Sequence, residues 1–183
     1  MPRSPPSGVF DGTVAVSDSA AVGYRLFLHP EAEAEPSRIP LLVYFHGNGE
    51  VARDCEQRSF SRIVHLFWDS LADVKAARLS DDSLASRYLA LPASLLVFEY
   101  RGYGWSSNQF PKFSTLLSDA EACLNAVPSI LGSGDGSVPP MVVYGRSMGS
   151  LCACHLARRF SDDLAGVVVE SGMSAMRRLS EVR

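Results

Sequence analysis

The chain has 183 residues, of which 46% are hydrophobic and 20% are charged, and its formal net charge at pH 7 is −3. Length and composition fit one globular domain, and the charge gives no electrostatic reason to expect nucleic acid as a partner. No apolar run reaches the roughly 18 residues of a membrane span and the N-terminus lacks the apolar run of a secretory signal, so we expect a cytoplasmic protein without a transmembrane segment.

Six short apolar runs between turn-rich segments predict β-strands. They cover residues 12–18, 23–29, 41–47, 94–100, 141–145 and 166–171. The first two runs alternate between apolar and polar residues, which favours an antiparallel edge. The last four are nearly continuous in Leu, Val, Phe and Tyr, as in parallel strands that are buried on both faces.

Helical patterns lie between the later strands and cover residues 59–79, 115–131 and 150–160. Pro128 should end or kink the second of these helices. The long link after the third strand includes residues 74–93, where we expect additional helix on one face. Alternation of strands and helices predicts an α/β fold with a mostly parallel central sheet flanked by helices.

Three of the buried runs end in glycine-containing loops, YFHGNGE, EYRGYGWSS and YGRSMGS. Parallel sheets bind their ligands beyond the carboxyl ends of the strands, so these loops mark the candidate site. In the third loop, a glycine on each side of Ser147 at a distance of two residues permits a very tight turn from strand to helix. The backbone N–H of Met148, at the start of the helix, would then stabilise an oxyanion.

The motifs HGNG (46–49), YRGYGWSS (100–107) and GRSMG (145–149) occur in an order that resembles the α/β-hydrolases. The resemblance covers about residues 12 to 175 and points to the serine aminopeptidase-like and monoglyceride-lipase-like branch. It implies that Ser147 is the nucleophile and that the backbone N–H groups of Asn48 and Met148 bind the oxyanion. The residues that it implies have a structural part in these loops are His46, Gly47, Gly49, Gly102, Gly104, Gly145 and Gly149.

A serine nucleophile needs a general base and an acid that orients the base. The resemblance implies an acid after the seventh strand, or sometimes the sixth, and a histidine after the eighth. The printed sequence ends at Arg183, just beyond the sixth predicted strand. We therefore expect residues 1–183 to be a single hydrolase domain that is incomplete at its C-terminus, a fragment whose base and acid lie outside this chain.

The histidines of the chain offer one alternative base. His46 ends the third strand, which neighbours the fifth in this fold, although the resemblance gives it a structural part. His155 lies about 12 Å from Ser147 along the predicted helix. His65 falls inside a predicted helix, and His29 follows an early edge strand.

Two carboxylates are candidates for the acid. Glu170 ends the sixth strand and would be the acid in the less common arrangement, although an ordinary strand-end carboxylate is the simpler interpretation. Asp119 opens a predicted helix, where the helix dipole favours a carboxylate in the first turn.

The sequence therefore predicts a serine hydrolase that cleaves an ester, thioester or amide of a small-molecule or acyl substrate through an acyl-enzyme. The alternative is a non-catalytic binding or regulatory protein with the same fold. No cofactor and no metal is predicted, because no His, Cys, Asp or Glu cluster has ligand spacing. The four cysteines are expected to be small buried thiols, and peripheral membrane contact is left open.

Overall fold

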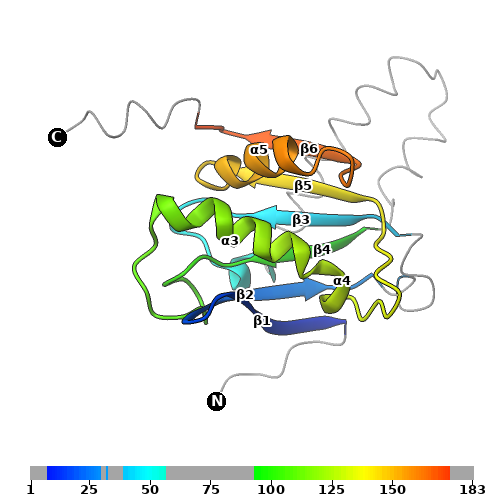
Figure 1. Ribbon diagram of the computed structural model, residues 1–183, viewed down its shortest axis with the longest axis horizontal. Coiled ribbons are helices and arrows are strands. Elements are labelled where there is room, and N and C mark those ends of the chain that lie inside the picture. The colour runs from blue at the N-terminus through cyan, green and yellow to red at the C-terminus, as the bar shows by residue number, and fades with distance from the viewer. Residues whose placement is uncertain (1–7, 30–31, 33–38, 57–92, 174–183) are drawn as a thin grey trace.

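The computed structural model describes residues 8–29, 32, 39–56 and 93–173, which form one sheet with helices packed on it (Figure 1). The strands are β1 (Val9–Ser17), β2 (Ala20–Phe27), β3 (Leu41–Phe45), β4 (Ser94–Phe98), β5 (Met141–Arg146) and β6 (Gly166–Glu170). The helical segments are η2 (Ala52–Glu56), α3 (Phe113–Asn125), α4 (Val127–Ile130) and α5 (Gly149–Arg159). All six predicted strands are therefore present.

The strands lie in the order β1-β2-β4-β3-β5-β6. Strands β4, β3, β5 and β6 are parallel to one another, whereas β1 and β2 form an antiparallel edge that joins β4. The parallel strands place their carboxyl ends at one side of the sheet, and the three glycine loops follow β3, β4 and β5 there (Figure 1). The predicted mostly parallel sheet with an antiparallel edge is confirmed.

The central strands β3 and β4 are buried at every residue. Their alternating side chains divide the core into two clusters, because successive residues of a strand point to opposite faces. Val43 and Phe98 pack on one face beneath α3 and α5, which lie side by side over the sheet (Figure 1). Tyr44 and Val97 pack on the other face, where Ala52 of η2 joins them.

Strand β6 corrects the prediction that the last four strands are buried on both faces. It pairs with β5 alone within the described part of the sheet, and its residues alternate between half-buried and exposed. Val167 and Val169 are 37% and 46% exposed. An apolar run identifies a strand, but its burial depends on neighbours that the run itself does not specify.

The helix predicted over 115–131 is present but divided. Helix α3 ends at Asn125 and α4 begins at Val127 with Pro128 in its first turn. A proline is tolerated there because the N–H groups of a first turn have no partner within the helix. The break that Pro128 predicted is confirmed. The helix predicted over 59–79 and most of the additional helix over 74–93 lie outside the described residues.

Three cysteines are buried as expected, whereas Cys154 is exposed on α5, so that part of the cysteine prediction is wrong. Its spacing from the buried Cys152 already placed the two thiols on different faces of the helix.

Among the described residues, no helix is long and apolar enough to cross a membrane.

Candidate functional site

Ser147 occupies the sharp turn between β5 and α5. Its φ angle is 50°, in the left-handed region that residues other than glycine rarely adopt. A Cβ atom on Gly145 would lie 2.3 Å from the carbonyl oxygen of Gly149, and one on Gly149 would lie 1.9 Å from that of Phe45. Both glycines of the GRSMG motif are therefore needed for the backbone to pack this closely.

The backbone N–H and carbonyl of Ser147 are hydrogen-bonded, but its hydroxyl is not. The Ser147 N–H donates to the carbonyl of Glu170 at 2.9 Å, and the Ser147 carbonyl accepts from the N–H of Ser150 at 3.0 Å. Within the described ranges no group is hydrogen-bonded to the Ser147 hydroxyl, and the residue is half-buried. The turn is thus held firmly while its side chain stays available for reaction.

The two N–H groups predicted to bind an oxyanion are also unused. In the part of the chain that the structure describes, the backbone N–H groups of Asn48 and Met148 form no hydrogen bond. The packing of Gly149 on the carbonyls of Phe45 and His46 brings the two loops into direct contact. Two free N–H donors on loops that contact each other suit the stabilisation of a developing oxyanion.

His46 is completely buried and both of its ring nitrogens are occupied. Nδ1 lies 2.8 Å from the carbonyl oxygen of Gly47, and Nε2 lies 3.0 Å from Oε2 of Glu99. A carbonyl only accepts, so Nδ1 must carry a proton, and Nε2 is joined to Glu99 by a second hydrogen bond. Neither nitrogen is left to accept the proton of Ser147, so the geometry does not support His46 as the base.

The other histidines are no better placed. Nε2 of His155 lies 2.6 Å from Oε1 of Glu121, in a side-chain contact between α5 and α3. The backbone N–H of His29 donates to the hydroxyl of Ser94 at 3.1 Å, at the amino end of β4 and therefore at the opposite end of the strands from Ser147. His65 lies outside the described residues. None of the three described histidines can serve Ser147 as a base.

The loop after β4 supports the loop after β3. The Tyr100 hydroxyl donates to the carbonyl of His46 at 2.7 Å, and the Tyr103 hydroxyl donates to Oδ1 of Asn48. Both tyrosine rings lie beside the imidazole of His46, with ring centroids 4.5 and 5.6 Å from it. The HGNG and YRGYG motifs therefore form one packed unit.

The remaining motif glycines fit the same unit. Gly49, Gly102 and Gly104 all have positive φ angles, whereas Gly47 does not. A Cβ atom on Gly104 would lie 2.3 Å from Oε1 of Glu99. A larger residue there would displace the carboxylate that binds His46.

A charged network that the sequence analysis missed lies beside the turn. Arg146 donates to Oε1 of Glu50, and its Nε lies 3.5 Å from Oε1 of Glu170. The Tyr44 hydroxyl donates to Oε2 of Glu50 at 3.0 Å, and the Tyr144 hydroxyl donates to Glu170. The only available signal was alternation, which places Tyr144 and Arg146 on one face of β5.

Burial and carboxylate neighbours keep both tyrosines of this network protonated. Burial, followed by the charge of Glu50, raises the pKa of Tyr44 well above its usual value. Burial, followed by the hydrogen bond to Glu170, raises the pKa of Tyr144 in the same way. The Glu170 carboxylate thus contacts Tyr144 and Arg146, and no described histidine lies against it.

Asp119 differs from its prediction. It lies in the second turn of α3 and forms a bidentate salt bridge with Arg101, in which both N–O distances are 2.7 Å. The hydrogen bond that Arg101 donates to the Asp119 carboxylate raises the pKa of Arg101. The expectation that the helix dipole stabilises Asp119 in the first turn is wrong, because the helix begins earlier, at Phe113.

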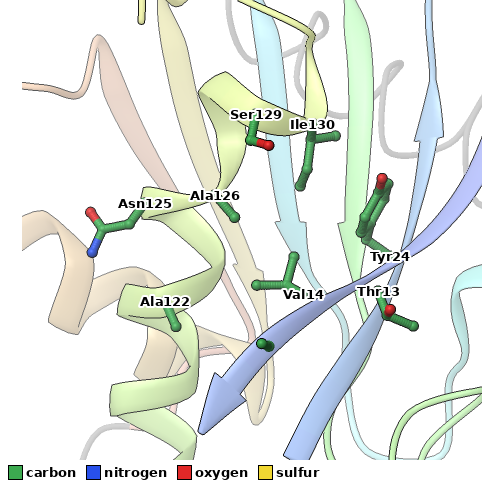
Figure 2. A pocket seen from close by; sticks show the side chains of 9 residues that line it. Thr13, Val14, Tyr24, Ala122, Asn125, Ala126, Ser129 and Ile130 are labelled. Carbon is green, nitrogen blue, oxygen red and sulfur yellow. The ribbon is translucent and has the colours of Figure 1, made fainter. Parts of the chain in front are cut away.

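The pocket drawn in Figure 2 is separate from this site. It has a volume of about 460 Å³ and lies between β1, β2 and the end of α3 with α4. Its lining residues are Thr13, Val14, Ala15, Tyr24, Ala122, Asn125, Ala126, Ser129 and Ile130. Strands β4 and β3 lie between these strands and β5, so the pocket does not contact Ser147.

No family model matches the sequence. Two relatives match half of the chain, at 92 residues each. The uncharacterized membrane protein YNL320W of Saccharomyces cerevisiae is 29% identical over 50% of this chain and 31% of its own length. The alpha/beta hydrolase domain-containing protein WAV2 of Arabidopsis thaliana is 26% identical over 50% of this chain and 29% of its own length. The matched part thus spans about a third of each relative.

Solved structures match most of the chain. The esterase Pf2001 of Pyrococcus furiosus has a TM-score of 0.58 and 16% identity, over 90% of this chain and 51% of that structure. A predicted CIB-like hydrolase from Thermoplasma acidophilum has a TM-score of 0.52 and 17% identity, over 90% of this chain and 63% of that structure. The chain has the α/β-hydrolase fold, as the order of its motifs predicted.

Proposed function

We propose that the chain carries the nucleophile of a serine hydrolase that cleaves an ester, thioester or amide of a small-molecule or acyl substrate. The observation that carries this proposal is Ser147 itself, which has a left-handed backbone and a free hydroxyl in a turn that packs on the loop after β3. The resemblance of the fold to an esterase supports the same class of reaction.

The reaction would proceed through an acyl-enzyme. Ser147 Oγ attacks the carbonyl carbon of the substrate as its proton passes to a general base, and the N–H groups of Asn48 and Met148 stabilise the oxyanion. The C–O, C–S or C–N bond then breaks and the leaving group takes the proton. Water, deprotonated by the same base, then attacks the acyl carbon. The bond from that carbon to Ser147 Oγ breaks, the base returns the proton to Oγ, and the acid is released.

We propose that the general base and the acid that orients it are residues outside this chain. The described histidines support this step, because His46 and His155 are bound to Glu99 and Glu121. The 183 residues would then be one part of a longer, single hydrolase domain of the serine aminopeptidase-like or monoglyceride-lipase-like branch. We propose the cytoplasm as its location.

A fluorophosphonate probe tests the proposal on the native protein, isolated from its own source. The probe should label wild type at Ser147, and Ser147→Ala should remove the labelling. Ser171→Ala is the matched control, since Ser171 also has a left-handed backbone, with φ of 49°. Equal labelling of wild type and Ser147→Ala contradicts the proposal.

The second candidate is a non-catalytic binding or regulatory protein. The observation in its favour is that no described histidine reaches Ser147. It predicts that the 183-residue chain folds alone, unfolds cooperatively in urea and is not labelled by the probe. Aggregation of that chain on expression, or labelling at Ser147 in the native protein, counts against it.

A further inference from the structure

Glu50 connects the loop after β3 to the turn that holds Ser147. Its Oε2 accepts hydrogen bonds from the N–H of Gly47 and the hydroxyl of Tyr44, both at 3.0 Å. Its Oε1 accepts from Nη1 of Arg146, the residue directly before Ser147. One carboxylate therefore bonds to both of the loops that form the candidate site.

The bonds of Glu50 constrain the N–H of Asn48 without using it. The Glu50 N–H donates to the carbonyl of Gly47 at 3.3 Å, so backbone and side chain both close the short loop 47–50. Asn48 lies inside this loop, and the Tyr103 hydroxyl binds its side chain. Fixed neighbours around a free N–H are the arrangement that a preorganised oxyanion donor requires.

Arg146 is held from a second side as well. Its Nε lies 3.5 Å from Oε1 of Glu170, and the carbonyl of Glu170 accepts the N–H of Ser147. The side chains of Arg146 and Glu50 are 44% and 26% exposed. Ion pairs with this much exposure contribute little to global stability, so the effect expected from this one is geometric.

We infer that Glu50 is a positioning residue: through Arg146 it fixes the Asn48 N–H relative to the Ser147 hydroxyl. The inference rests on the proposed function, because it names the residue that aligns the donor and the nucleophile of that site. Misalignment of such a donor slows the chemical step more than it weakens binding, since the bond forms only as charge develops.

Glu50→Gln isolates this role. The amide oxygen of glutamine can still accept from Gly47 and Tyr44, whereas its NH₂ group replaces the oxygen that faces Arg146. Glu121→Gln is the matched control. The side chain of Glu121 is 28% exposed and its carboxylate bridges His155 and Arg159, away from the loop after β3.

The experiment measures fluorophosphonate labelling of the complete native protein and separates the maximal rate of inactivation from the probe concentration at half that rate. Glu50→Gln should lower the maximal rate by roughly 10- to 100-fold, somewhat less than the loss of a whole oxyanion donor. The half-saturating concentration and the melting temperature should match those of Glu121→Gln. Equal maximal rates for the two variants overturn the inference, while Ser147 labelling of wild type leaves the proposed function intact.

Arg146→Met removes the same contact by changing its other partner, and it replaces Glu50→Gln in the experiment if that variant does not fold. It should lower the maximal rate to a similar extent, and the double variant should be little slower than either single one, since both remove one link. Additive losses overturn the inference. A wild-type protein that is not labelled at Ser147 refutes the proposed function itself, which distinguishes the two failures.

Discussion

Ser147 and Ser171 have nearly the same backbone in different surroundings. They follow the neighbouring parallel strands β5 and β6, whose last residues Arg146 and Glu170 are paired, and their φ angles are 50° and 49°. Ser171 is exposed and leads into an irregular bend, whereas Ser147 is half-buried at the start of a helix. A left-handed serine is therefore not enough to identify a nucleophile.

The difference lies in what packs around each turn. Behind Ser147, Gly149 lies against the carbonyl of Phe45, which leaves no room for a side chain. Behind Ser171, a Cβ on Gly172 would approach side-chain atoms, of which Cγ1 of Val169 is the nearest, and no backbone. The turn at Ser147 is held by immobile backbone, and that makes its strain useful for presenting a side chain in a fixed direction.

Alanine at these two glycines should give the largest contrast. A Cβ on Gly149 would lie 1.9 Å from Phe45 O, and one on Gly172 would lie 2.7 Å from Cγ1 of Val169. Gly149→Ala should cost about 3 kcal/mol or more, because backbone cannot move aside, and Gly172→Ala about 1 kcal/mol or less. Urea denaturation measures both. Similar losses would show that the two turns are equally adaptable.

Alkaline pH tests how well the network beneath the two turns is shielded from water. Because the pKa values of Tyr44 and Tyr144 are raised above the usual 10.0, the unfolded chain loses these protons first as pH rises. The free energy of unfolding should therefore fall above pH 10, by at most about 1.4 kcal/mol per pH unit for each tyrosine. Urea titrations between about pH 9 and 11 measure the slope.

The tyrosine variants supply the control for this measurement. Tyr44→Phe and Tyr144→Phe should each flatten the alkaline slope, because phenylalanine has no proton to lose. An unchanged slope in both variants would mean that these hydroxyls already ionise in the folded protein. If only one variant has a flatter slope, the tyrosine changed in the other variant already ionises in the folded protein and is therefore open to water.

Glycine at the two serines should give the smallest effect. Ser147→Gly and Ser171→Gly remove the side chain from a residue with a left-handed backbone and so relieve its strain. This relief should exceed the cost of the extra flexibility of glycine in the unfolded chain and stabilise each protein by roughly 0.5 kcal/mol. Thermal denaturation checks both, and only Ser147→Gly should also lose probe labelling. Destabilisation by both variants would mean that neither turn is strained.

Local patterns in the sequence were sufficient to predict the six strands and the turn at Ser147. An apolar run bounded by turn residues is enough to predict a strand, and the spacing of Gly145 and Gly149 around a serine is enough to predict the tight turn. The break at Pro128 was predictable for the same reason, since the missing N–H is a property of that residue alone.

Features that depend on distant partners were not predictable. The contact between Glu50 and Arg146 joins residues 96 positions apart, and it requires the parallel pairing of β3 with β5. The exposure of Val167 follows from the place of β6 in the sheet rather than from its composition. Asp119 was assigned to a first turn because the start of α3 at Phe113 has no side-chain cap to mark it.

The hydrogen bond from the Ser147 N–H to the carbonyl of Glu170 makes the turn depend on β6, an edge strand within the described sheet. Edge strands fray more readily than central ones, and amide hydrogen exchange records that local opening. The Ser147 amide should therefore exchange with solvent as fast as β6 opens, and faster than the amides of β3. Any molecule that stabilises the outer edge of β6 should slow that exchange, so the backbone of the proposed nucleophile is sensitive to binding at the edge of the sheet.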